Sequence, residues 1–142
     1  MKTIQTRFGE VEYDPSLVLH FPEGLIGLDQ LNNFVVMPNK KQGPLFWIQC
    51  VDDPAFAFVV TDPTSFFPDY FVVPDDNERR KLGIDAQGEC FVLAIVTVSE
   101  AKEITFNLSG PILYAPATNR ALQVILEDPR YDTRTPLPKI GQ

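Results

Sequence analysis

Residues 44–74 read PLFWIQCVDDPAFAFVVTDPTSFFPDYFVVP and contain three short apolar runs, at residues 45–51, 55–60 and 70–73. The runs are rich in β-branched and aromatic residues, and Asp, Pro and Ser stand between them. Short apolar runs bounded by such turn residues are typical of β-strands rather than helices. Because Phe and Trp bury a large area per residue, we expect much of the hydrophobic core to form around this segment.

The same part of the chain is strongly acidic. Between Pro44 and Glu78 there is no Lys or Arg, and the seven acidic residues equal the formal net charge of −7 of the whole chain: Asp52, Asp53, Asp62, Asp69, Asp75, Asp76 and Glu78. Nucleic-acid binding depends largely on Lys and Arg that neutralise phosphates, so this charge disfavours direct contact with nucleic acid. It favours solubility and attracts basic partners.

Apolar runs and turn signals continue on both sides of this segment. Residues 2–6 and 10–13 predict a hairpin around Arg7, Phe8 and Gly9, because Gly9 can supply the positive φ that a tight turn often needs. Residues 25–33 fit a loop or one helical turn, the polar residues 38–43 a turn, and the charged residues 75–83 a surface loop or a short helix. Further strands are predicted at residues 17–21, 34–37, 91–98, 104–108, 112–115 and 121–126. About ten short strands between regular turns indicate an all-β fold, an antiparallel sandwich or barrel with little helix.

Length and composition are those of a globular protein. The 142 residues suit a single domain, 1–142, and the 44% hydrophobic content argues against disorder. No apolar run approaches the roughly 20 residues that span a bilayer, and the first residues lack the apolar region of a signal peptide. We therefore expect a cytoplasmic protein without membrane contact. The Pro-rich tail, residues 129–142, is expected to carry no strand beyond about Thr133.

Residues that would support metal or redox chemistry are few. Cys50 and Cys90 both stand in apolar runs, which favours buried free thiols over a disulfide or redox pair. His20 is the single histidine and has apolar neighbours on both sides, so a structural strand position is favoured over a zinc site. The sequence has neither a phosphate-binding glycine loop nor a Gly-x-Ser-x-Gly elbow. We expect no enzymatic activity, no metal and no cofactor.

Two alternative readings of the acidic and aromatic residues are weaker. Paired carboxylates at residues 52–53 and 75–76 would suit acid–base catalysis. However, Asp53 and Asp62 precede prolines, as do Asp14 and Asp128, and Asp-Pro steps at strand ends are typical of turns. The aromatic residues at positions 66, 67, 70 and 71 would suit stacking of nucleic-acid bases, but acidic residues surround them. A protein-binding module remains, or an acidic solvated face that binds nothing.

Six segments carry a pattern that extends in order over nearly the whole chain. They are TRFGEVEYDPSLVLHFPEGLIGLD (6–29), FWIQCVDDPAFAFVVTDP (46–63), FFPDY (66–70), VLAIVTV (92–98), NLSGPILYAPATNRALQVIL (107–126) and YDTRTPL (131–137). Together they resemble the flagellar assembly factor FliW family. The resemblance implies a small single-domain antiparallel β-barrel without catalysis.

The resemblance also implies two protein partners bound in turn. FliW-like proteins bind flagellin, and when free of it they bind the carbon storage regulator CsrA, a small basic RNA-binding protein that represses flagellin translation. Capture of CsrA then lets translation resume. The implied protein is a monomer when free. The alternative is an acidic β-barrel that binds a small ligand or another basic protein, unrelated to flagella.

Eight residues are the candidates for contact with a partner. Asp69, Tyr70, Asp75, Asp76 and Glu78 are the first choice for the basic regulator, and Asp52 and Asp53 are weaker choices. Phe8, at the tip of the predicted hairpin, is an apolar candidate for either partner, or packs beneath the rim of the barrel.

Overall fold

The computed structural model describes residues 1–37 and 44–137. The polar turn predicted at residues 38–43 and the end of the tail, residues 138–142, lie outside the described residues. The strands are β1 (Lys2–Thr6), β2 (Gly9–Tyr13), β3 (Leu19–His20), β4 (Asn33–Met37), β5 (Leu45–Cys50), β6 (Ala57–Thr61), β7 (Phe91–Val98), β8 (Ile104–Phe106), β9 (Ile112–Ala115), β10 (Arg120–Gln123) and β11 (Thr135–Pro136). The described residues also form the 3₁₀ turns η1 (Pro15–Leu17) and η2 (Pro63–Ser65) and one α-helix, α1 (Asp76–Leu82).

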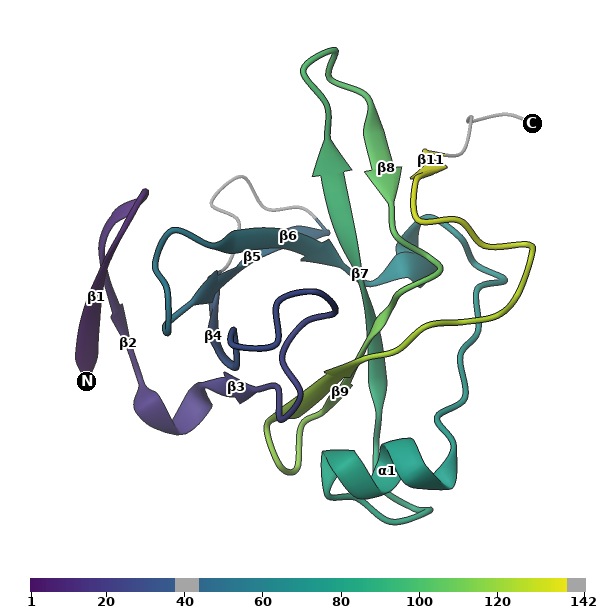
Figure 1. Cartoon of the computed structure of the whole chain (residues 1–142), viewed down its shortest axis with the longest axis horizontal. Coiled ribbons are helices and arrows are strands. Elements are labelled where there is room, and N and C mark those ends of the chain that lie inside the picture. Colours follow the sequence, from purple (N-terminus) through teal and green to yellow (C-terminus); the bar gives the residue numbers. More distant parts are fainter. Residues whose placement is uncertain (38–43, 138–142) are drawn as a thin grey trace.

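Seven of the described strands close a barrel-like ring (Figure 1). The order is β7-β6-β5-β4-β3-β10-β9, and β9 pairs back onto β7. The pairs are antiparallel except β3 and β10, which are parallel and meet at His20 and Arg120. β8 and β11 extend the sheet from β7, and the β1–β2 hairpin lies apart as its own two-stranded sheet. The predicted all-β fold with little helix is confirmed.

The interior of the ring is the main hydrophobic core. Alternate residues of each strand face inward, and the buried inward side chains include Phe34, Ile48, Val60 and Ile112. The loop between β3 and β4 crosses one opening of the ring (Figure 1) and buries Leu25, together with other apolar residues, in the same cluster. Residues 25–33 therefore form a loop that closes one end of the ring.

The middle of β7 packs against apolar clusters on both faces, which explains why its sequence is apolar at successive positions. Its Leu93 packs on the ring interior, whereas Ala94 and Val96 pack outside it against Phe106. α1 covers a third cluster through the fully buried Leu82. The strand predicted at residues 91–98 is confirmed with its bounds.

Three strand predictions need correction. Residues 70–73 form no strand, because no neighbouring strand pairs with them in the described part of the chain. The strand predicted at 17–21 shrinks to β3, because the Asp14 side chain accepts a hydrogen bond from the Ser16 amide and starts η1. The tail does carry a strand beyond Thr133, since Thr135 and Pro136 pair with β8.

The two cysteines are free thiols. Cys50 is buried as predicted, and Cys90 is only partly buried. Burial raises the pKa of both thiols. Across residues 1–37 and 44–137 no helix combines the length and apolar content that crossing a bilayer requires.

Candidate partner-binding surface

The eight candidate residues lie in three separate places. Asp75, Asp76 and Glu78 stand at the start of α1, Asp69 and Tyr70 in the loop before it, and the other three around the turn between β5 and β6. They do not form one continuous acidic surface. Most of these side chains make hydrogen bonds or packing contacts within the chain itself, and these contacts are different in each of the three places.

The start of α1 is a capping box. The Asp75 carboxylate accepts a hydrogen bond from the Glu78 amide at 2.7 Å, and the Glu78 carboxylate accepts one from the Asp75 amide at 2.9 Å. These contacts satisfy amides that a helix start otherwise leaves unpaired. Gly83 ends the helix with φ +75°. Of the two possibilities given for residues 75–83, a surface loop or a short helix, the structure forms the helix, at residues 76–82.

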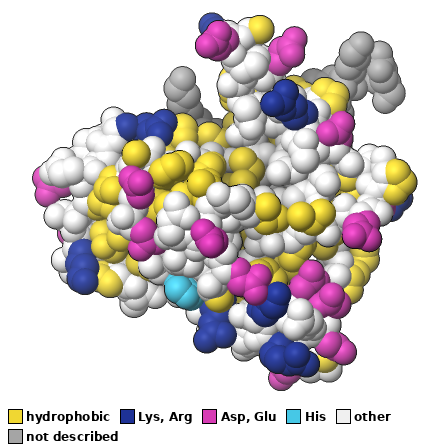
Figure 2. All heavy atoms as spheres, in the orientation of Figure 1, with side chains coloured by type: hydrophobic (Ala, Val, Ile, Leu, Met, Phe, Trp, Pro, Cys, Tyr) yellow, Lys and Arg dark blue, Asp and Glu magenta, His cyan; other side chains and the backbone are white. Residues whose placement is uncertain are grey.

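The acidic charge around α1 is not isolated. The basic side chains of Arg79, Arg80 and Lys81 stand in the last turn of the same helix. Figure 2 shows acidic and basic side chains side by side over α1, at the bottom of the view. Lys81 also forms an ion pair with Glu23 at 2.9 Å. The acidic run seen in the sequence is thus partly compensated where the helix presents it.

The capping box makes Asp75 and Asp76 a matched pair for mutation. We expect Asp75→Ala to lower the free energy of unfolding by about 1 kcal/mol, because it removes the cap. Asp76→Ala should change it by less than about 0.5 kcal/mol, since Asp76 is exposed and makes no hydrogen bond among the described residues. Urea unfolding of both variants measures the difference. Equal losses of unfolding free energy in the two variants would mean that the negative charge at the start of the helix, rather than the capping hydrogen bond, stabilises α1.

Tyr70 is a packing residue rather than a surface contact. Its side chain is 5% exposed, and its hydroxyl donates a hydrogen bond to the Leu108 carbonyl at 2.6 Å. The ring packs edge-on against Tyr131 with 4.8 Å between centroids, and burial raises the pKa of the Tyr70 phenol. The neighbouring Asp69 is exposed. Tyr70 therefore holds the loop that presents Asp69.

Asp52 connects the end of β5 to the start of β4. Its carboxylate accepts hydrogen bonds from the amides of Asn32 and Asn33, both at 2.8 Å, and from the Asn33 side chain at 3.0 Å. Partial burial alone would raise the pKa of Asp52, but these hydrogen bonds outweigh it and hold the pKa below its ordinary value. The Asn33 side-chain oxygen in turn lies 2.9 Å from Nδ1 of His20, which agrees with the structural position predicted for the histidine.

The lowered pKa of Asp52 predicts how acid affects stability. A depressed pKa in the folded state adds stability above the unfolded-state pKa of about 3.9, and that stability is lost as the pH falls through the folded pKa. We expect Asp52→Asn to lower the free energy of unfolding by about 1 kcal/mol at pH 7. The two proteins should converge as the pH falls through the lowered pKa of Asp52. Denaturation at pH 7, 5, 4 and 3 measures this, and a constant difference would contradict it.

Asp53 and Phe8 lie at the same side of the ring. The Asp53 carboxylate accepts a hydrogen bond from the Ala55 amide at 3.1 Å, so its predicted turn role is confirmed. Arg7 donates a hydrogen bond to the Ala55 carbonyl at 2.7 Å, which fixes the tip of the β1–β2 hairpin beside this turn. The Phe8 ring packs edge-on against Trp47 and is 42% exposed. Phe8 thus combines packing with an accessible apolar surface.

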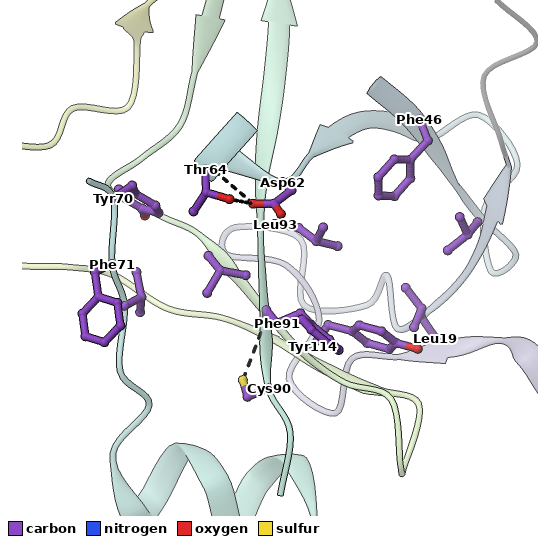
Figure 3. A pocket seen from close by; sticks show the side chains of 13 residues that line it. Leu19, Phe46, Asp62, Thr64, Tyr70, Phe71, Cys90, Phe91, Leu93 and Tyr114 are labelled. Atoms are coloured by element: carbon purple, nitrogen blue, oxygen red, sulfur yellow. Dashed lines mark hydrogen bonds between the residues drawn. The ribbon is translucent and has the colours of Figure 1, made fainter. Parts of the chain in front are cut away.

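An apolar groove at the open end of the ring is the feature that the sequence did not predict. Its volume is about 630 Å³. Figure 3 shows Phe91 of β7 between Leu19 and Phe46 on one side and Tyr70 and Phe71 on the other. Phe71 is 76% exposed and Phe91 is 52% exposed. Such a concave surface lined by exposed aromatic side chains is a usual place for a ligand or a partner.

Comparison with known proteins identifies the family. The model of the FliW protein family matches residues 2–137. The chain belongs to the FliW family. It is 60% identical to the flagellar assembly factor FliW of Syntrophotalea carbinolica over 96% of this chain and 98% of that protein. It is 56% identical to flagellar assembly factor FliW 2 of Desulfotalea psychrophila, over 99% and 93% of the two chains.

A solved structure supports the same family assignment. The crystal structure of a flagellar assembly factor FliW matches with a TM-score of 0.88 and 29% sequence identity, and covers 99% of this chain and 100% of that one. The barrel-like ring, α1 and the strands beyond the ring are therefore features of a FliW fold. The family resemblance drawn from the six sequence segments is confirmed.

Proposed function

We propose that this chain is a non-enzymatic flagellar assembly factor of the cytoplasm that binds flagellin and, when free of it, binds and antagonises the translational regulator CsrA. The single observation that carries the proposal is the family match over residues 2–137, together with relatives named flagellar assembly factor FliW. Capture of CsrA would relieve repression of flagellin translation. Flagellin production would then follow flagellin export.

The surface chemistry is consistent with protein partners. The chain carries a formal net charge of −7, which speeds encounter with a basic protein such as CsrA. We propose that the exposed carboxylates of Asp69, Asp75 and Asp76, together with the half-buried Glu78, make this contact, while Tyr70 supports the loop that carries Asp69. Phe8 with Asp52 and Asp53 forms a second proposed contact at the hairpin tip.

Charge reversal at an exposed position tests the electrostatic part of this proposal. We expect Asp76→Lys to slow association with CsrA and to flatten its dependence on salt, because rim charges act mainly on encounter. Glu100→Lys is the matched control: it changes the net charge equally, and Glu100 is exposed in the turn between β7 and β8. Stopped-flow association at several salt concentrations compares them. An equal effect of both variants would place the contact elsewhere than α1.

Direct binding tests the proposed function as a whole. Calorimetric titration of the purified chain with flagellin, and separately with CsrA, should give saturable binding in both cases. Binding of neither partner would contradict the proposal. Thermal unfolding of the same sample serves as the control that the chain is folded.

A further inference from the structure

The first residues of β7 have one edge without a strand. β6 pairs with β7 only at residues 94–96, whereas residues 91–93 pair with β9 on the opposite edge. β6 stops at Thr61 because Asp62 and Pro63 start η2. The Asp62 carboxylate accepts a hydrogen bond from the Thr64 amide, and Pro63 has no N–H that could join a β-ladder. In the described part of the chain, no strand continues β6 along this edge.

The backbone groups of Val92 face this open edge. In an antiparallel ladder, successive residues direct their N–H and C=O groups to opposite edges. The Asn107 amide donates to the Ile95 carbonyl at 2.9 Å on the β8–β9 edge, so residues 91, 93 and 95 face that edge. Val92 therefore directs its N–H and C=O to the edge that β6 leaves. In the described part of the chain, the β6–β7 ladder does not reach Val92, and no turn or loop hydrogen bond joins its backbone on this edge.

The open edge runs along the apolar groove. Leu19, Phe46 and Tyr114 line the groove on the inner face of the sheet, and Phe71 and Val72 line it on the outer face. Figure 3 shows Leu19, Phe46 and Tyr114 on one side of β7 and Phe71 on the other. A strand added here would place successive side chains alternately into these two apolar surfaces. The added segment would therefore be apolar at successive positions, as strands that are buried on both faces are.

One fixed charge stands at the end of the open edge. Among the described residues that line the groove, Asp62 is the only one with a formal charge at pH 7. Its Oδ1 accepts hydrogen bonds from the amide and the hydroxyl of Thr64, at 2.9 and 2.7 Å. The carboxylate is therefore held in one orientation, and Oδ2 makes no hydrogen bond or ion pair in the described part of the chain. A Lys or Arg at the end of an apolar run would complement it.

We infer that the open edge of β7 binds an extended segment of a partner protein by strand addition. The segment has three or four successive apolar residues, preceded by a Lys or Arg beside Asp62. Its backbone pairs with the N–H and C=O of Val92, and its side chains fill the groove on both faces of the sheet. The inference rests on the proposed function in one respect: the molecule bound at this edge is taken to be part of a protein.

Amide exchange at Val92 tests the inference. The full chain, labelled with ¹⁵N, is titrated with the peptide acetyl-Lys-Ser-Val-Phe-Val-Ser-amide, and exchange of the Val92 amide is followed by NMR. At saturation we expect exchange to slow about tenfold, because one added hydrogen bond protects the amide. The same peptide N-methylated at its three apolar residues cannot pair and should leave the rate unchanged. An unchanged Val92 amide, or equal protection by both peptides, would overturn strand addition.

Asp62→Asn tests the charge with a matched control. We expect it to weaken binding of the Lys peptide about two- to fivefold, without affecting a peptide that has Gln in place of Lys. Asp14→Asn is the control, because Asp14 caps η1 through the Ser16 amide and hydroxyl at the same distances of 2.9 and 2.7 Å. Equal weakening by both variants, or none, would remove Asp62 from the site. These outcomes are independent of the titrations with flagellin and CsrA, so the two proposals fail separately.

Discussion

Phe34→Ala lowers the free energy of unfolding by about 3–5 kcal/mol. The Phe34 side chain is fully buried inside the ring and packs edge-on against Phe21, with 5.2 Å between ring centroids. The Phe58 ring of β6 lies next to it, with 6.1 Å between ring centroids. Since small domains are stabilised by only about 5–15 kcal/mol in total, this loss should move the urea midpoint far to lower concentration.

Val36→Ala is the control for this result. Val36 lies two residues further along β4, on the same face of the strand, and is 48% exposed at the groove. We expect it to cost less than about 1 kcal/mol, because little of its surface is buried. If both variants lost a similar free energy of unfolding, Phe34 would not be more tightly packed than Val36. That result would contradict a ring whose interior is packed at Phe34 and open at the groove.

Gly24→Ala lowers the free energy of unfolding by more than about 2 kcal/mol. Gly24 has φ +69°, and an added Cβ would lie 2.6 Å from the backbone of Asp29 across the loop that closes the ring. An L-residue at this φ is strained by about 1–2 kcal/mol, and the contact with backbone adds to that strain because the backbone cannot yield like a side chain. Thermal or urea unfolding measures the loss.

Gly27→Ala separates the two causes. Gly27 lies in the same loop with φ +82°, but an added Cβ would meet no atom within 4 Å. We expect Gly27→Ala to cost only the strain, about 1–2 kcal/mol. Equal losses in the two variants would mean that the loop does not press against Gly24 and does not close the ring tightly.

Local turn chemistry was the part of the fold that the sequence predicted best. Asp14, Asp53, Asp62 and Asp128 each accept a hydrogen bond from the amide two residues further on. This contact depends only on the Asp side chain and the fixed φ of the following proline, so short-range sequence suffices. The long strand at residues 91–98 was predictable for a similar reason, because its apolar residues occupy both faces.

Predictions that depend on distant partners were less successful. Residues 70–73 have the composition of a strand, but composition does not reveal that no strand lies beside them. β11 was missed for the opposite reason. Thr135 and Pro136 do not have the composition of a strand, and they pair only because the tail returns to β8. The seven negative charges counted between Pro44 and Glu78 also leave out the three basic residues that follow directly in the same helix.

The groove was not predicted from the sequence. It exists because β6 ends at Thr61, opposite Ala94, whereas β7 extends three residues further along that edge, to Phe91. One signal was available, the apolar residues at positions 91, 92 and 93, which predict a strand covered on both faces. Nothing in the chain's own local pattern says that one edge stays open.

Competition between the two proposed partners is the most direct test of the proposed partner switch. CsrA is titrated calorimetrically into the purified chain alone, and then into the chain saturated with flagellin. We expect saturable heat in the first titration and its loss in the second. Equal heat in both titrations would contradict the proposed partner switch, as would the absence of heat in the first.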